Sequence, residues 1–167
     1  FYLFYKFSVN TLFFVFLFFI LNFQISLSFF SMFETSTPSL ISIVIYFCIV
    51  RFNISPSSII LLLTGFLHDI MIGNNFGITS IFLLLLKYFT NSLILEKVNK
   101  DNQEEWIYFT IIFILSLSIV FLINLIISFS LPELSPIFFH VGSTLILYPL
   151  INISINFFSF VSRLIKS

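Results

Sequence analysis

Six long apolar runs, separated by short polar stretches, constrain this chain more than any other feature. Only 8% of its 167 residues are charged and 59% are hydrophobic, whereas a soluble globular domain carries roughly 25% charged residues. A run of about 20 apolar residues is long enough to cross a bilayer as a helix. The sequence therefore predicts an all-α fold, a polytopic membrane protein built as a bundle of six transmembrane helices. We expect one integral membrane domain over residues 1–167 and no soluble domain.

The second of these runs is the shortest. Its twelve residues would span about 18 Å as a helix, less than the ~30 Å thickness of the hydrocarbon core. It must therefore borrow flanking residues, thin the bilayer, or be re-entrant. The six predicted segments are Phe7–Phe30, Ser39–Val50, Ser57–Ile72, Phe76–Leu95, Trp106–Phe129 and Ile137–Phe160.

The positions of the basic residues predict an orientation. With six spans, the termini and every second loop fall on one side of the membrane, and the opposite loops contain Glu34 and Glu133 but no Lys or Arg. Because basic residues are enriched on the cytoplasmic side, we expect both termini to be cytoplasmic. The net charge is zero, so nucleic acid is not an expected partner. Membrane lipid is an expected partner because the predicted helices are apolar. The basic residues on the shared side are Lys6, Arg51, Lys97, Lys100, Arg163 and Lys166.

Four residues at intervals of four form what we call the glycine–aspartate stripe: Gly65, Asp69, Gly73 and Gly77. Residues spaced by four share a helix face, and small residues there let a neighbouring helix approach closely. The sequence Gly73-Asn74-Asn75 predicts a turn, so Gly73 is expected to end the third helix and Gly77 to let the fourth helix start close beside it. The stripe is our candidate structural or interaction motif.

Asp69 is the residue of the stripe that needs an explanation, because a carboxylate inside an apolar segment is costly. Three interpretations stay open: a carboxylate hydrogen-bonded to the turn or to a neighbouring helix, a proton or ion relay, and a contact with a partner protein. Other polar positions of interest are His68 and His140, which could cluster with Asp69, and Lys87, which could snorkel or pair with a carboxylate.

A proline lies in the middle of the sixth segment. Pro149 is expected to kink that helix, and the carbonyl that it frees is expected to be met by Thr144 or by a neighbouring helix. No nucleophile elbow, zinc-binding motif or phosphate-binding glycine loop occurs in the sequence. We therefore expect a non-enzyme with no catalytic residue, no metal site and no cofactor.

Taken in order, these features resemble the MreD family, the rod shape-determining membrane proteins of bacteria. The glycine–aspartate stripe is similar to the family's pattern at its third and fourth helices. Pro38 with the aliphatic run that continues to Tyr46 is similar to its second helix, and Tyr148-Pro149 resembles an aromatic–proline pair in its last helix. The resemblance covers about residues 7–163.

The resemblance implies a non-catalytic subunit of the cell-elongation machinery in the bacterial inner membrane, where it would scaffold MreC and the peptidoglycan synthases. The implied partners are MreC, MreB, RodA and a class B penicillin-binding protein. The alternative is a substrate-binding component of an energy-coupling vitamin transporter, which is similar in size and in its six-helix plan. Such components dock through alanine-rich patches on the first helix, whereas the first segment here has neither Ala nor Gly.

Overall fold

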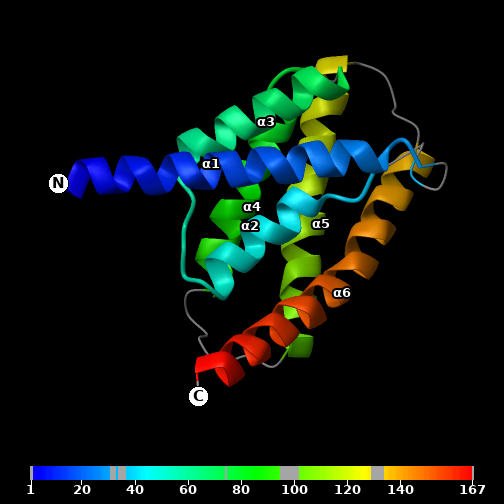
Figure 1. Ribbon diagram of the computed structural model, residues 1–167. Helices are drawn as coiled ribbons and strands as arrows, with labels where there is room; N and C mark the ends of the chain where they lie inside the picture. The colour runs from blue at the N-terminus through cyan, green and yellow to red at the C-terminus, as the bar shows by residue number, and fades with distance from the viewer. Residues whose placement is uncertain are drawn as a thin grey trace.

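In the computed structural model, the described backbone covers residues 2–30, 33, 37–73, 75–94, 102–128 and 134–166, and side chains are described for 10–30, 33, 37–73, 75–93, 104–128 and 134–154. Over these ranges the chain forms helices and no strand (Figure 1). This confirms the prediction of an all-α fold with six helices. They are α1 (Tyr2–Leu27), α2 (Leu40–Val50), α3 (Ser58–Ile72), α4 (Ile78–Ile94), α5 (Asn102–Ser128) and α6 (Leu134–Lys166).

Three of the six helices are long and apolar enough to cross a membrane: α1, α5 and α6. The other three have 11, 15 and 17 residues, which is about 16 to 26 Å at 1.5 Å per residue. The length and composition of the three long helices fit a membrane location.

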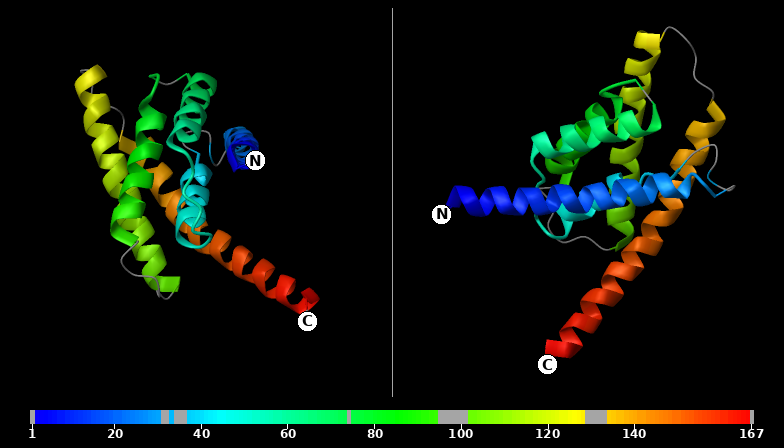
Figure 2. Two further views of the ribbon diagram at one scale, coloured as in Figure 1. Left: turned by 90° about the vertical axis from the view of Figure 1, so that its left-hand side faces the viewer. Right: turned by 45° about the horizontal axis from the view of Figure 1, so that its top comes forward.

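Consecutive helices run in alternating directions. In Figure 1 the odd-numbered helices run toward the right or upward, and the even-numbered helices return toward the lower left. The C-terminus lies at the lower left of this view, and the N-terminus lies at the left, above it. Figure 2 shows α1 end-on in the view where α4 and α5 run from top to bottom, so α1 crosses them at a steep angle. The bundle is therefore crossed and not parallel.

The core forms around α2, of whose 11 residues eight are buried. Leu17 and Leu21 of α1, Leu61 of α3 and Phe113 of α5 are also fully buried. Because its neighbours cover it, α2 does not depend on its own length to match a hydrocarbon core. This explains how so short and so apolar a helix fits the fold.

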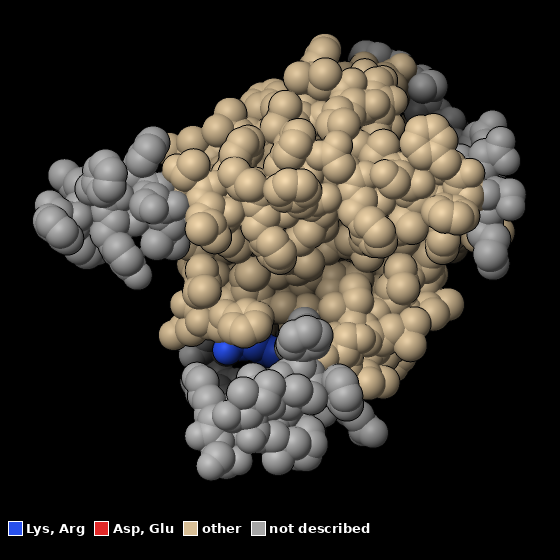
Figure 3. Space-filling view, in the orientation of Figure 1, with Lys and Arg blue, Asp and Glu red and all other residues tan. Residues whose placement is uncertain are grey.

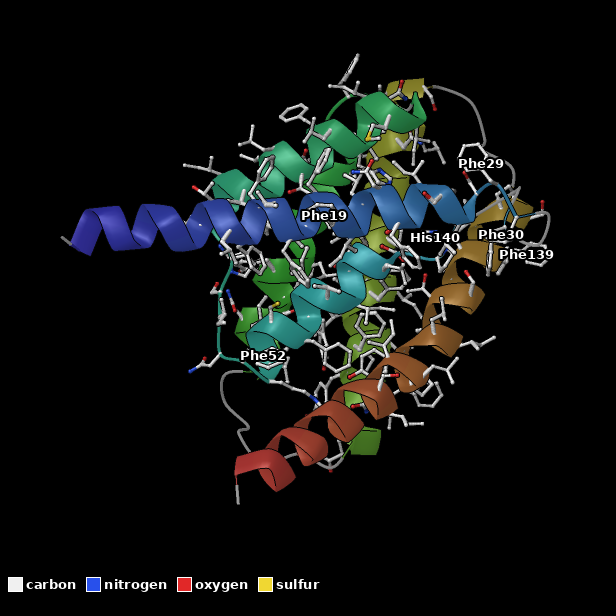
Figure 4. All side chains as sticks on the ribbon, viewed as in Figure 1. Phe19, Phe29, Phe30, Phe52, Phe139 and His140 are labelled. Atoms are coloured by element: carbon white, nitrogen blue, oxygen red, sulfur yellow. The ribbon has the colours of Figure 1, made fainter. Side chains whose placement is uncertain are left out.

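The exterior is apolar and carries few charges. Figure 3 shows a surface almost free of Lys, Arg, Asp and Glu over the described part of this face, with cationic atoms only at its lower edge. Figure 4 labels Phe19, Phe29, Phe30, Phe52 and Phe139, which are 57% to 86% exposed. A soluble monomer rarely exposes apolar patches larger than a few hundred Å², whereas such side chains suit contact with lipid.

Prolines shift two helix boundaries from their predicted places. Leu40 donates its N–H to the carbonyl of Pro38, so a tight turn precedes α2 and Pro38 lies outside its first turn. Pro136 lies just before the predicted sixth segment but is in the first turn of α6, where its fixed φ suits a helix and its missing N–H costs nothing. Pro149 lies inside α6, which continues through it.

Most of the residues behind the predicted orientation cannot be placed. Glu34, Lys97, Lys100 and Glu133 lie outside the described residues, as does Asn74 of the predicted turn. The side chains of Lys6, Arg163 and Lys166 are also outside the described part, although their backbone is helical. Arg51 is described and lies directly after α2.

Candidate functional site

At Gly65 the helices α3 and α4 approach each other closely. A Cβ atom at Gly65 would lie 2.5 Å from the backbone Cα and N of Ser80 and from its Oγ, a distance that real Cβ contacts do not show. The Ser80 hydroxyl in turn donates to the Leu62 carbonyl at 2.9 Å. The close helix neighbour expected at Gly65 is therefore present, and it is the first turn of α4.

Two other glycines of the stripe shape the turn between these helices. Gly73 ends α3 in the left-handed conformation, with φ 78° and ψ 25°, and donates its N–H to the Asp69 carbonyl. Gly77 has φ 91° and precedes α4. A Cβ at Gly77 would meet only Phe66, at 3.9 Å. The cap at Gly73 is as predicted, but Gly77 is needed for its backbone conformation and not for a close approach.

The carboxylate of Asp69 binds the start of the next helix. Its side chain is fully buried. Oδ2 accepts the N–H of Gly77 at 2.7 Å, and both carboxylate oxygens lie 3.3 Å from the N–H of Thr79. N–H groups at a helix N-terminus lack partners within their own helix and carry partial positive charge. Asp69 therefore caps α4 from α3, which favours the first of the three interpretations given above.

His68, beside Asp69, links α3 to α1 and α4. Its Nδ1 lies 3.2 Å from Thr79 Oγ1, and its Nε2 lies 3.2 Å from Gln24 Nε2. The Gln24 Oε1 accepts the N–H of Ile41, and because a backbone N–H can only donate, the amide NH₂ must face His68. His68 Nε2 is then an acceptor and Nδ1–H donates to Thr79. These contacts require a neutral imidazole.

His140 and Thr144 hold the start of α2 against α6. His140 Nδ1 lies 2.6 Å from the Thr37 carbonyl oxygen, to which it must donate. The Thr144 hydroxyl accepts the N–H of Ser39 at 2.9 Å and donates to the His140 carbonyl at 2.7 Å. The backbone entering α2 thus finds its partners on a helix about 100 residues later in the chain.

The two histidines line one cavity of about 170 Å³. Asp69 does not line it, because its carboxylate faces the α3–α4 turn. The predicted cluster therefore divides into a histidine cavity and a carboxylate cap. Within the ranges that the structure describes, no three His, Cys, Asp or Glu residues are placed to hold a metal ion. The cavity is lined by Gln24, Ser39, Ile41, His68, Ile78, Thr79, Phe82, Leu83, Leu117, Val120 and His140.

The Lys87 side chain and the carbonyl that Pro149 leaves free both have partners on neighbouring helices. Lys87 Nζ donates to Ser58 Oγ at 3.0 Å, so among the described contacts it meets a hydroxyl and not a carboxylate. Pro149 cannot donate to the carbonyl four residues earlier, and that carbonyl, of Leu145, accepts the indole N–H of Trp106 at 3.3 Å. A neighbouring helix supplies the partner, as predicted. The suggestion that Thr144 supplies it is wrong, because its hydroxyl binds His140.

A second polar group lies at the opposite end of α2, and sequence reasoning missed it. Arg51 forms an ion pair with Glu105, with its Nη2 2.7 Å and its Nε 3.1 Å from the same carboxylate oxygen. The Tyr46 hydroxyl donates to the Glu105 carbonyl at 2.9 Å. An Arg directly after one apolar run and a Glu at the start of another, on the same predicted side, was the available signal.

Aromatic rings connect this ion pair to the histidine cavity. The Arg51 guanidinium lies 5.2 Å from the Phe47 ring centre. From there, stacked pairs lead through Tyr148, Phe109 and Phe113 to His140, with ring centres 4.6 to 6.0 Å apart. We call this set the aromatic column. Such pairs contribute about 0.5–1.5 kcal/mol each beyond their buried area.

The polar side chains of both regions are engaged mainly with backbone groups and with one another. Asp69 binds the N–H groups of Gly77 and Thr79, His68 binds Gln24 and Thr79, and Arg51 binds Glu105. This arrangement can fix the helices against one another. Comparison of the chain with models of protein families, with curated proteins and with solved structures finds no match.

Proposed function

We propose that this chain is a non-catalytic, MreD-like subunit of the bacterial cell-elongation machinery. The observation that carries the proposal is the use of Asp69. The stripe on which the resemblance rests builds a tight α3–α4 pair, because its carboxylate caps α4 and Gly65 admits Ser80. The polar group of this motif is occupied by hydrogen bonds within the chain. This suits a scaffold better than a catalyst or an ion relay, which needs polar groups that are free to bind a substrate or an ion.

The proposal includes a six-pass topology in the inner membrane with both termini in the cytoplasm. It is supported by the alternating directions of consecutive helices (Figure 1). The asymmetric Lys and Arg positions support it independently. A reporter fused after residue 100 is expected to read as cytoplasmic, and a periplasmic signal would contradict the six-pass topology.

As a scaffold, the chain would act with MreC, MreB, RodA and a class B penicillin-binding protein. The apolar exterior supports this role, since helices α1, α5 and α6 leave many large hydrophobic side chains exposed, among them Leu12, Ile126 and Phe138. Single-pass partners could pack on such surfaces within the bilayer.

The alternative, a vitamin-binding component of an energy-coupling transporter, needs a larger polar site. Small-molecule pockets measure about 300–1,000 Å³ and combine apolar walls with a few polar groups. The polar cavity between His68 and His140 measures about 170 Å³. The larger groove between α5 and α6, of about 580 Å³, is lined mainly by apolar side chains, so it offers few of the polar groups that a vitamin site needs, which favours the scaffold role over vitamin binding.

Replacement of the resident MreD in a rod-shaped bacterium tests the role. Cells that express this chain are expected to keep a constant width, and MreC is expected to co-purify with it from mild detergent. Cells carrying Gly65→Leu are expected to become round, whereas cells carrying Gly142→Leu should stay rod-shaped because a Cβ at Gly142 meets nothing within 4 Å.

Two results would contradict the proposal. One is round cells despite wild-type protein levels and a normal thermal midpoint. The other is co-purification of an ATPase module and a bound vitamin in place of MreC, which would favour the transporter.

A further inference from the structure

Three polar groups of the histidine cavity have hydrogen-bonding capacity that the described part of the chain does not use. The Thr79 hydroxyl accepts from His68, so its own hydrogen has no acceptor. His140 donates through Nδ1 to Thr37, so its Nε2 carries a lone pair without a donor. Ser39 bonds through its backbone only, to Thr144 and Ser42. Ser39 is buried, and Thr79 and His140 are partly exposed, so an occupant that both donates and accepts a hydrogen bond can pair with these groups.

The occupant should be uncharged. Among the residues that line the cavity, none is acidic or a Lys or Arg. His68 is held neutral by Gln24, as shown above, and Asp69 is bound to the α4 N-terminus. A buried charge would find no counter-charge here and would carry a large desolvation cost. A hydroxyl group donates and accepts without charge.

An apolar groove of about 580 Å³ adjoins the cavity between α5 and α6. Leu117 and Val120 of α5 line both spaces, and on α6 the cavity residue His140 is followed by the groove residue Val141. A polar cavity and an apolar groove that share two lining residues match the two parts of an amphiphile. The groove is lined by Ile114, Leu117, Ser118, Val120, Phe121, Leu122, Asn124, Leu134, Ile137, Phe138 and Val141.

We propose that the cavity and groove together bind an uncharged, hydroxyl-bearing amphiphile. Its hydroxyl group lies in the cavity, donating to His140 Nε2 and accepting from Ser39, and its hydrocarbon chain lies between α5 and α6. The inference rests on the membrane placement proposed above and not on the cell-shape role, because binding is measured on the purified protein.

A photoreactive analogue of hexadecanol, with a diazirine in its chain, provides the probe. In nanodiscs that contain the purified full chain, labelled positions are expected to concentrate within residues 114–122 and 137–141. Excess hexadecanol should suppress the labelling, whereas hexadecane at the same mole fraction should not. Equal competition by both would overturn the proposal, since it would mean that the polar recess adds nothing. Uniform labelling of the exterior would also overturn it.

Two serines give a matched pair of variants. Ser39→Ala removes a hydroxyl that no described residue binds, so the fold should persist while the affinity for hexadecanol falls about 2- to 10-fold, the equivalent of one hydrogen bond. Ser118→Ala removes a groove hydroxyl that already donates to the Ile114 carbonyl and should leave affinity unchanged. If Ser39→Ala binds as the wild type does, the cavity holds only water and the proposal is wrong. Val120 lines both the cavity and the groove, so the larger side chain of Val120→Trp should occupy the space where they meet. This variant should abolish labelling while its elution volume in size-exclusion chromatography stays that of the wild type.

Discussion

The bundle has one polar region around Asp69 and another around Arg51 and Glu105, and the carboxylate in each is stabilised in a different way. Asp69 is fully buried and bound to the N–H groups of Gly77 and Thr79, with no cation among its described partners. Glu105 is 14% exposed and pairs with Arg51, which is 17% exposed. One negative charge is met by the partial charges of a helix N-terminus, and the other by a full positive charge.

The difference follows from what each region joins. The Asp69 cap connects residues eight to ten positions apart and fixes one pair of consecutive helices. The Arg51–Glu105 pair connects residues 54 positions apart and ties α2 to α5. A cap needs correct local geometry, whereas an ion pair needs both charged partners. Four substitutions, ordered by expected effect, test this difference between a helix cap and an ion pair.

Gly65→Leu is expected to have the largest effect. Overpacking usually costs about 1–3 kcal/mol, but here the added atoms meet the backbone of Ser80 at 2.5 Å, which cannot rotate away, so the loss should exceed about 4 kcal/mol. Most of the protein should be lost as aggregate during size-exclusion chromatography in detergent. Gly142→Leu is the matched control and should elute as the wild type does. Normal elution of Gly65→Leu would show that the α3–α4 contact is not tight.

Asp69→Leu should follow, with a loss of about 2–4 kcal/mol, because the N–H groups of Gly77 and Thr79 are left buried without an acceptor. Asp69→Asn keeps one carbonyl oxygen and should cost about 1 kcal/mol, mainly through the lost charge–dipole attraction. Thermal midpoints in detergent measure both. Equal losses in the two variants would show that the negative charge, and not the hydrogen bonding, makes the cap.

Arg51→Met should cost about 2 kcal/mol, because it leaves the Glu105 carboxylate partly buried without its cation. Adding Glu105→Gln should recover part of that loss. A double-mutant cycle on thermal midpoints gives the coupling, and no recovery in the double variant would contradict the view that this end depends on matched charge.

Trp106→Phe should have the smallest effect, about 0.5–1 kcal/mol, since one hydrogen bond to the Leu145 carbonyl is lost. In a Pro149→Ala background, residue 149 regains an N–H for that carbonyl, so the effect of Trp106→Phe should nearly vanish. The same loss in both backgrounds would mean that the indole does not serve the carbonyl that Pro149 frees.

Local features of this fold were predictable from the sequence. The cap at Gly73 follows from turn chemistry, and the close neighbour at Gly65 follows from the four-residue spacing. The bonding of Asp69 within the turn was also one of the interpretations drawn from the sequence. Each depends on residues close in the chain or on the general behaviour of small residues in packed helices.

Long-range partners were not predictable. Gln24 looked like an isolated polar residue of the first segment, yet it joins His68 to the start of α2. The sequence did not predict a role for Thr79, because threonine is common in apolar helices. Nothing in the local pattern states which helices will be neighbours, so the Arg51–Glu105 pair was missed.

The short spacing of the α3–α4 contacts sets an order of assembly. The hydrogen bonds of Asp69 and Ser80 span 8 to 18 residues, so this hairpin can close as soon as α4 is synthesised. The start of α2 must wait for His140 and Thr144, more than 100 residues downstream. At about 5–20 residues per second, some 50 residues separate the two events, a delay of roughly 3–10 seconds. During that interval the chain holds a finished hairpin, while the Ser39 N–H and the Thr37 carbonyl just before α2 still lack their partners on α6.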